Sequence, residues 1–178
     1  MMITDQLNML IYPYSYIYMN KGKILLWQTG EGGPDSFVLN CKNQLISADT
    51  EENMKKLLGD KSGRIQWSEP AEINFDLFWK ALKNLRVNRA SSAKTCKLLL
   101  DGWNFIEDLL TTYQCTDEVH ILQSPLLNKV YKKLFAGSNL PSVTPEGKSY
   151  APLWLPEEIS AIRDEFRHIW GVLDKYLT

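Results

Sequence analysis

The stretch from Ser92 to Tyr113 reads SAKTCKLLLDGWNFIEDLLTTY and predicts a long α-helix. Its apolar residues recur in steps of three and four, which places them along one side of a helix. They are Cys96, Leu99, Trp103, Ile106, Leu110 and Tyr113, and the stripe is widened by Leu98, Leu100, Phe105 and Leu109. A stripe this wide indicates a helix that is buried on most sides, around which the rest of the fold is arranged.

The same stretch leaves one narrow polar face. Its members, again in steps of three and four, are Lys94, Lys97, Asp101, Asn104, Asp108 and Thr111. We expect this strip to face water and Lys97 to pair with Asp101 one turn later. Gly102 costs about 1 kcal/mol of helix propensity relative to alanine, so it predicts a close approach by another element. Nothing on this helix indicates catalysis.

The residues that precede this helix are rich in β-formers. Tyr14–Met19 and Lys23–Thr29 flank Asn20-Lys21-Gly22, which predicts a hairpin with glycine at the left-handed position. A second pair of runs flanks another turn, so four short strands are expected in meander order. The expected strands are Tyr14–Met19, Lys23–Thr29, Ser36–Asn40 and Gln44–Ala48, with residues 63–67 able to add a fifth.

Helical signals dominate the rest of the chain. Asp49 and Glu52 fit a capping box for a helix over Glu51–Leu58 that ends at Gly59, and Ser124-Pro125 is a typical helix start. Helices are also expected from Asn74 onward, over the central stretch, and over Pro156–Leu177. The aperiodic, proline-rich segment Ser138–Pro152 is the longest expected loop and the most mobile candidate.

Strands followed by helices are the pattern of an α+β protein. We therefore expect a single globular domain over residues 1–178. Its N-terminal antiparallel β-sheet, of about four or five strands over residues 12–67, would pack against a C-terminal bundle of about four or five helices over residues 74–177.

Composition narrows the class of protein. The 178 residues carry a net charge of −1, so no global field drives the chain onto nucleic acid or anionic lipid. Three cysteines without paired spacing argue against a disulfide framework and for a reducing compartment. The N-terminus lacks the pattern of a secretory signal, and no apolar run is long enough to span a membrane. A soluble, cytoplasmic protein is expected.

The motifs of enzymes and cofactor sites fail one by one. Gly147-Lys148-Ser149 resembles the end of a phosphate-binding loop, but the required earlier glycine is replaced by Ser142. Cys115 and His120 form a single loose pair without the second pair that structural zinc needs, and neither histidine has a nucleophile motif nearby. We therefore expect no enzyme: no catalytic residue, no metal and no cofactor.

Basic residues are concentrated between Leu77 and Leu100, where no acid occurs. They are Lys80, Lys83, Arg86, Arg89, Lys94 and Lys97. Such a run is usually the solvated face of packed helices, but it could also line the phosphates of a nucleic acid. In that alternative the protein is an RNA-binding or other nucleic-acid-binding regulator, and the tyrosines at positions 12, 14, 16 and 18, on one face of a strand, could stack on bases. Motifs of the RNP type are absent.

Three segments together resemble a known class of protein. They are YPYSYIYMNKGKILLW (residues 12–27), FWKALKNLRV (78–87) and SSAKTCKLLLDGWNFIEDLLTTY (91–113). In overall texture the chain resembles the cytoplasmic immunity proteins of bacterial contact-dependent growth inhibition and related polymorphic toxin systems. The resemblance implies a small, cofactor-free antitoxin that acts by direct protein–protein binding to the C-terminal domain of a cognate toxin, often a nuclease. It carries over no particular site residue.

Acidic residues supply the candidate toxin interface. Between Leu98 and Asn128 the chain has five acids and no lysine or arginine. A nuclease holds its substrate with cationic surface, so an inhibitor gains association rate and specificity by presenting acids. The candidates are Asp101, Asp108, Asp117 and Glu118. The alternative is that these acids only solubilise a helix and pair with Lys94, Lys97 or Lys129; the next candidates are then Glu51, Glu52, Glu69, Glu72 and the Ser138–Pro152 loop.

Overall fold

The computed structural model describes residues 9–30, 33–68 and 71–177, and within them the chain has the expected α+β class. It forms two compact units. The first comprises Met1–Asp76 and Asp108–Cys115, and the second comprises Leu77–Glu107 and Thr116–Thr178.

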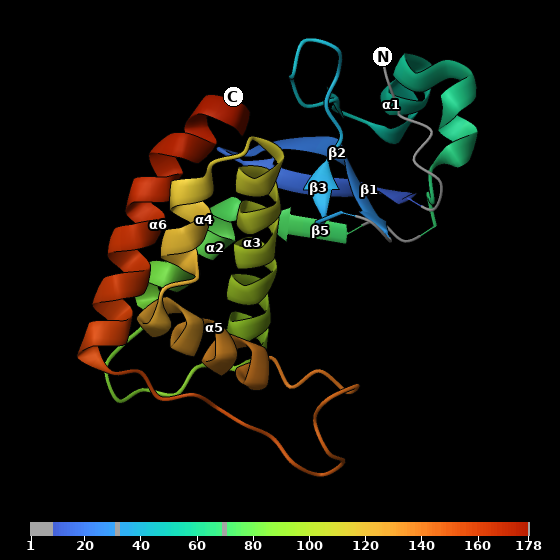
Figure 1. The fold of residues 1–178 in the computed structure, drawn as a ribbon. Coiled ribbons are helices and arrows are strands. Elements are labelled where there is room, and N and C mark those ends of the chain that lie inside the picture. The colour runs from blue at the N-terminus through green and yellow to red at the C-terminus, as the bar shows by residue number, and fades with distance from the viewer. Residues whose placement is uncertain (1–8, 31–32, 69–70, 178) are drawn as a thin grey trace. The chain divides into compact units, whose positions relative to one another are not determined.

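A mixed β-sheet forms the centre of the first unit (Figure 1). Its strands are β1 (Met9–Tyr18), β2 (Lys21–Gly30), β3 (Ser36–Phe37), β4 (Ser47–Ala48) and β5 (Ala71–Asn74). They lie in the order β3-β2-β1-β5, and β4 also pairs with β2. The β1–β2 ladder is antiparallel and continuous from Met9 opposite Gly30 to Tyr18 opposite Lys21. The hairpin predicted from the sequence is therefore confirmed.

The turn of this hairpin differs from the prediction. Met19 and Asn20 occupy the two loop positions with φ of 51° and 58°, so the left-handed residues are these two and not Gly22. A methionine rarely adopts this conformation, and it needs compensation. Asp76 provides it: its carboxylate accepts hydrogen bonds from the backbone N–H of Met19 at 3.1 Å and of Asn20 at 2.9 Å.

The fifth strand lies later in the sequence than expected. Gly59–Arg64 forms a 3-10 helix, and Ile65 makes only a single bridge to Ile11. Ile65 and Trp67 suggested a strand, but Trp67 instead turns its indole N–H back to the Ser62 carbonyl at 3.0 Å. The strand β5 pairs with β1 in parallel, which makes the sheet mixed instead of purely antiparallel.

Helix α1 (Glu51–Leu58) has the predicted bounds but a different cap. Thr50, not Asp49, is the N-cap, and its hydroxyl accepts from the Asn53 N–H at 3.2 Å. Gly59 ends the helix with φ of 57° and ψ of −134°, a backbone conformation that glycine adopts at little cost. Buried apolar residues from α1, the strands and the loops form one core: Ile11, Leu26, Val38, Ile46, Met54, Leu58 and Ile65.

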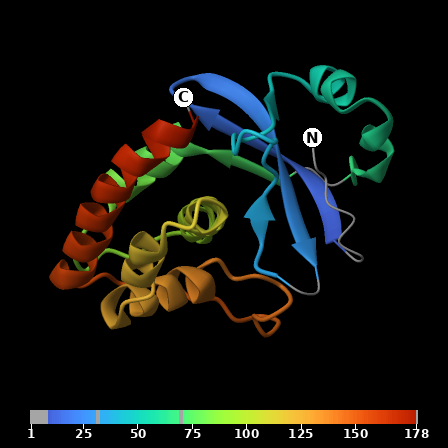
Figure 2. The same cartoon turned by 45° about the horizontal axis from the view of Figure 1, so that its top comes forward.

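Helices build the second unit. They are α2 (Phe75–Asn84), α3 (Ala93–Thr112), α4 (Thr116–Leu122), α5 (Pro125–Gly137) and α6 (Pro156–Leu177), of which α2 begins and α3 ends in the first unit. Figure 2 shows α4, α5 and α6 beside one another. Helix α2 follows β5 directly, so Asn74 closes a strand where the sequence predicted only a helix cap.

The close approach predicted at Gly102 is present. A Cβ atom at this position would lie 2.3 Å from Cδ2 of Phe78 on α2. Phe78 packs at 5.4 Å from the ring of Phe166 on α6, which also lies 5.1 Å from Trp103. Glycine at position 102 therefore lets the aromatic core of the second unit form against the backbone of α3.

The Ser138–Pro152 segment is held at both ends. Asn139 donates to the Tyr150 carbonyl at 2.9 Å and accepts from the Tyr150 N–H at 2.7 Å. Just beyond the segment, Trp154 is fully buried and donates its indole N–H to Ser91 at 2.8 Å.

Among the residues described, none of the helices is both long enough and apolar enough to cross a membrane.

Candidate functional site

Asp101 is partly neutralised inside its own helix. Its carboxylate lies 2.6 Å from Nζ of Lys97, the i,i+4 pair that the sequence predicted. The Asp101 side chain is 31% exposed and the Lys97 side chain 56% exposed. An exposed pair of this kind contributes little to stability, but it leaves Asp101 with less charge to offer a partner.

Asp108 has a structural task in the first unit. Its Oδ2 accepts a hydrogen bond from the indole N–H of Trp27 on β2 at 2.8 Å. One turn later the Thr112 hydroxyl accepts from the Phe37 N–H at 2.8 Å. The prediction that Asp108 lies on a water-facing strip is wrong, because the C-terminal part of α3 uses its polar face to hold strands.

Asp117 and Glu118 lie on α4, a short helix that is largely exposed. Only Leu122 is buried among the seven residues of this helix. Asp117 is exposed and Glu118 is half-buried, and the apolar side chain of Ile121 is 39% exposed on the same helix. Two of the four predicted interface acids therefore remain accessible on one short element.

Glu165 on α6 joins these acids, and sequence reasoning missed it. Burial raises the pKa of its carboxyl; nearby His168 lowers the pKa, and the charge of Glu118 raises it further. Its Oε1 is buried and has no hydrogen-bond partner among the residues described. No sequence pattern distinguishes Glu165 from other polar residues of α6. We call Asp117, Glu118 and Glu165 the acidic surface.

The structure gathers most of the predicted basic residues around one hollow. Lys80, Arg86, Arg89 and Lys94 line a cavity of about 410 Å³ where α2 ends and α3 begins. No acid and no aromatic residue is among the described residues that line it. Lys83 instead lies over the Trp79 ring at 5.2 Å, and Lys97 pairs with Asp101. We call this hollow the basic cleft.

Two arginines cap the end of α2 beside the basic cleft. Arg86 donates to the carbonyls of Lys83 at 2.7 Å and Leu85 at 2.9 Å. Arg163 from α6 donates to the same two carbonyls at 2.9 and 2.7 Å. Burial and the neighbouring charges of Arg86 and Arg167 lower the pKa of Arg163. The negative end of the helix dipole stabilises these cations where they crowd together.

The four tyrosines of β1 differ in burial. Tyr16 and Tyr18 are buried, and burial raises the pKa of Tyr16 to about 12. Tyr12 lies 6.0 Å from the Trp27 ring, and Tyr14 lies 6.0 Å from the Phe37 ring. Tyr16 and Tyr18 are therefore enclosed in the unit, whereas the half-buried Tyr12 and Tyr14 remain the candidates for base stacking.

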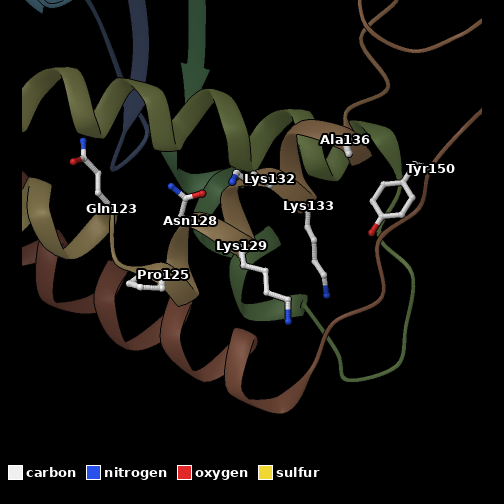
Figure 3. Close-up of a pocket in the computed structure, with 8 residues that line it drawn as sticks. All are labelled: Gln123, Pro125, Asn128, Lys129, Lys132, Lys133, Ala136 and Tyr150. Carbon is white, nitrogen blue, oxygen red and sulfur yellow. The ribbon is translucent and has the colours of Figure 1, made fainter.

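A second basic cavity, of about 550 Å³, lies along α5 (Figure 3). Lys129 and Lys133 extend from α5 in the same direction, with Tyr150 across from them on the loop. Both lysines meet the fully buried Glu158, at 3.3 and 2.7 Å. Burial alone would raise the pKa of Glu158, but hydrogen bonds from Lys133, the Leu155 N–H and Lys129 outweigh it and lower the pKa. This cavity is largely a structural ion-pair site.

The cysteines and histidines are dispersed. Cys96 is buried, and burial raises the pKa of its thiol to about 11. Within the part of the chain that the structure describes, no three His, Cys, Asp or Glu side chains are grouped so that they could hold a metal ion.

Comparisons of the chain with protein-family models, with curated proteins and with solved structures found no significant match.

Proposed function

We propose that this chain is a cytoplasmic immunity protein that binds and neutralises the C-terminal toxin domain, a nuclease, of a contact-dependent growth inhibition system. The action is direct protein–protein binding, and no cofactor, metal or catalytic step is part of it. The resemblance of residues 12–113 to immunity proteins motivates this class of function. The acidic surface on α4 and α6 supports it.

One observation carries the proposal: Asp117 and Glu118 on α4 have no ion pair among the described residues, and the charge of Glu118 acts on the half-buried Glu165 of α6. The charge of Glu118 raises the pKa of Glu165, while His168 lowers it, and Oε1 of Glu165, like Oε1 of Glu158, has no hydrogen-bond partner among the described residues. Glu158, on the same helix as Glu165, has two lysines, and Asp101 has one. A lysine or arginine from a partner would relieve the repulsion between the two glutamates and so contribute to affinity.

The chemistry of a nuclease fits this surface. An enzyme that holds RNA or DNA needs lysine and arginine side chains along its substrate path. Opposed charges steer two such proteins together and raise the association rate. The exposed side chain of Ile121 adds an apolar contact beside the acids, which matches the mixed character of protein interfaces.

The test is a binding experiment with a matched control. The parent, Asp117→Lys/Glu118→Lys and Asp35→Lys/Glu146→Lys are each titrated against the toxin domain encoded beside the gene. Both variants change the net charge equally, and the control acids are exposed residues outside the acidic surface. We expect the first variant to bind at least about tenfold more weakly, mainly through its association rate, while the control stays near the parent.

Two outcomes would contradict the proposal at different levels. If Asp117→Lys/Glu118→Lys folds, binds and protects cells like the parent, the acidic surface is not the interface. If the parent neutralises no toxin domain encoded beside its gene, the immunity function itself is wrong.

A further inference from the structure

The basic cleft brings together cations that are spread over 15 positions of the sequence. Lys80 comes from α2, Arg89 from the connection that follows it, and Lys94 from the first turn of α3. These three side chains have no ion pair to an acid among the described residues. Such a cluster is unfavourable when empty of counter-charge, and an anion would relieve its repulsion.

Neutral donors complete the lining of the basic cleft. Ser92 immediately precedes α3 and Thr95 lies in its first turn, with their hydroxyl oxygens 2.9 Å apart. This end of a 20-residue helix carries positive partial charge, which adds to that of the three cations. Ser91 accepts from the buried Trp154 indole at 2.8 Å, so the wall of the cleft is anchored to the core.

The size and polarity of the basic cleft indicate what it can hold. Its volume of about 410 Å³ falls in the range of small-ligand sites, roughly 300–1,000 Å³, and exceeds what one inorganic ion needs. Leu77, Leu85 and Leu98 supply apolar lining beside the cations. A ligand with a strongly anionic group and a less polar remainder matches both parts.

We propose that the basic cleft binds the phosphate group of a nucleotide unit, supplied either by a free mononucleotide or by a strand of RNA. Phosphate is the anion that several point-charge lysines and a forked arginine recognise together. No aromatic residue lines the cleft, so recognition rests on phosphate and sugar and is insensitive to base identity. This site is separate from the acidic surface, so the proposal does not depend on the toxin-binding function.

The test compares two variants of the full chain with equal charge loss. The first is Lys80→Ala/Arg89→Ala/Lys94→Ala, and the control is Lys21→Ala/Lys42→Ala/Lys148→Ala, all exposed residues. Arg86 is left unchanged because it caps α2. The probes are AMP by calorimetry and a fluorescein-labelled 12-nucleotide oligouridylate by anisotropy, over a salt series from about 50 to 200 mM.

We expect the parent to bind at least one probe, the cleft variant to lose at least about tenfold in affinity, and the control to stay within about twofold. If a strand contacts the three cations through three phosphates, the logarithm of the association constant should fall with the logarithm of the salt concentration with a slope near −2. Each phosphate contact of a single strand contributes about 0.7 to this slope. Tighter binding of the oligonucleotide than of AMP identifies a strand as the source, and tighter AMP binding identifies a free nucleotide. Binding of neither probe by the parent, or equal loss in both variants, would overturn the proposal.

Discussion

The basic and the acidic runs of this chain look equivalent in sequence. In the structure, most of the basic residues line one cleft, whereas the acids are dispersed. Four of the six basic residues between Leu77 and Leu100 converge on one cleft. The acids between Leu98 and Asn128 are divided: Asp101 pairs with Lys97, and Asp108 holds Trp27. Glu107 accepts a hydrogen bond from Gln123, whereas Asp117 is exposed and Glu118 acts on Glu165, which lies far away in the sequence. A run of one charge therefore does not by itself predict a charged surface.

The difference has a structural cause. The basic run crosses the connection between two helices, so residues before and after the turn line the same hollow. Most of the acidic run lies along α3, whose successive residues point in different directions and meet different neighbours. Convergence at a turn concentrates charge, whereas a helix distributes it.

The largest effect on stability is expected at Glu158, a buried acid that is paired with two lysines. Replacing the buried Glu158 by alanine leaves Lys129 and Lys133 without their shared carboxylate and the Leu155 N–H without its acceptor. Breaking a buried pair from one side costs about 3 kcal/mol of unfolding free energy, measurable by urea denaturation. Glu157→Ala, at the exposed neighbouring position, is the control and should cost much less. Equal losses in the two variants would show that compensation does not separate Glu158 from the surface acids.

The next largest effect on stability is expected from a comparison of Asp108 and Asp101, both on α3. Asp108→Ala leaves the half-buried indole N–H of Trp27 without this acceptor, and we expect a loss of about 1–3 kcal/mol together with a change in tryptophan fluorescence. Asp101→Ala removes only an exposed i,i+4 pair, with an expected loss of no more than about 0.5 kcal/mol. A large loss for Asp101→Ala and none for Asp108→Ala would reverse the roles assigned to them.

The smallest stability effect is expected at Glu165, and its sign matters. The folded-state pKa of this acid lies above its unfolded value, so folding is favoured below the unfolded pKa of about 4.3 and is penalised as the pH rises through the folded value. Glu165→Gln should therefore gain at most about 0.5 kcal/mol at neutral pH, and the gain should vanish below about pH 4. Denaturation curves across this pH range measure it.

The same substitution sharpens the distinction between a structural and a functional acid. Glu165→Gln should weaken toxin binding while it stabilises the free protein, because the carboxylate serves the complex at a cost to the fold. Glu158→Ala should lower stability instead. A Glu165→Gln protein that is less stable than the parent at neutral pH would contradict the uncompensated state of this acid.

Sequence reasoning succeeded where the signal is local. The period of the apolar residues located α3 within one residue at each end, and Gly102 marked the approach of Phe78. Capping and proline signals located α1 and α5, and alternation with a turn located the β1–β2 hairpin. Each of these features depends on residues within a few positions of one another, so a pattern in the sequence carries it.

The tertiary structure alone decided what depends on residues far apart in the chain. The parallel pairing of β5 with β1, the carboxylate of Asp76 on the hairpin turn and the bond between Trp27 and Asp108 join segments more than 50 positions apart. The meeting of Glu118 with Glu165 has the same origin. Local patterns were enough to predict α1, α2, α3, α5, α6 and the hairpin, but not the short helix α4. Which charges stay accessible was decided only by packing, because neutralisation requires a partner brought close through space.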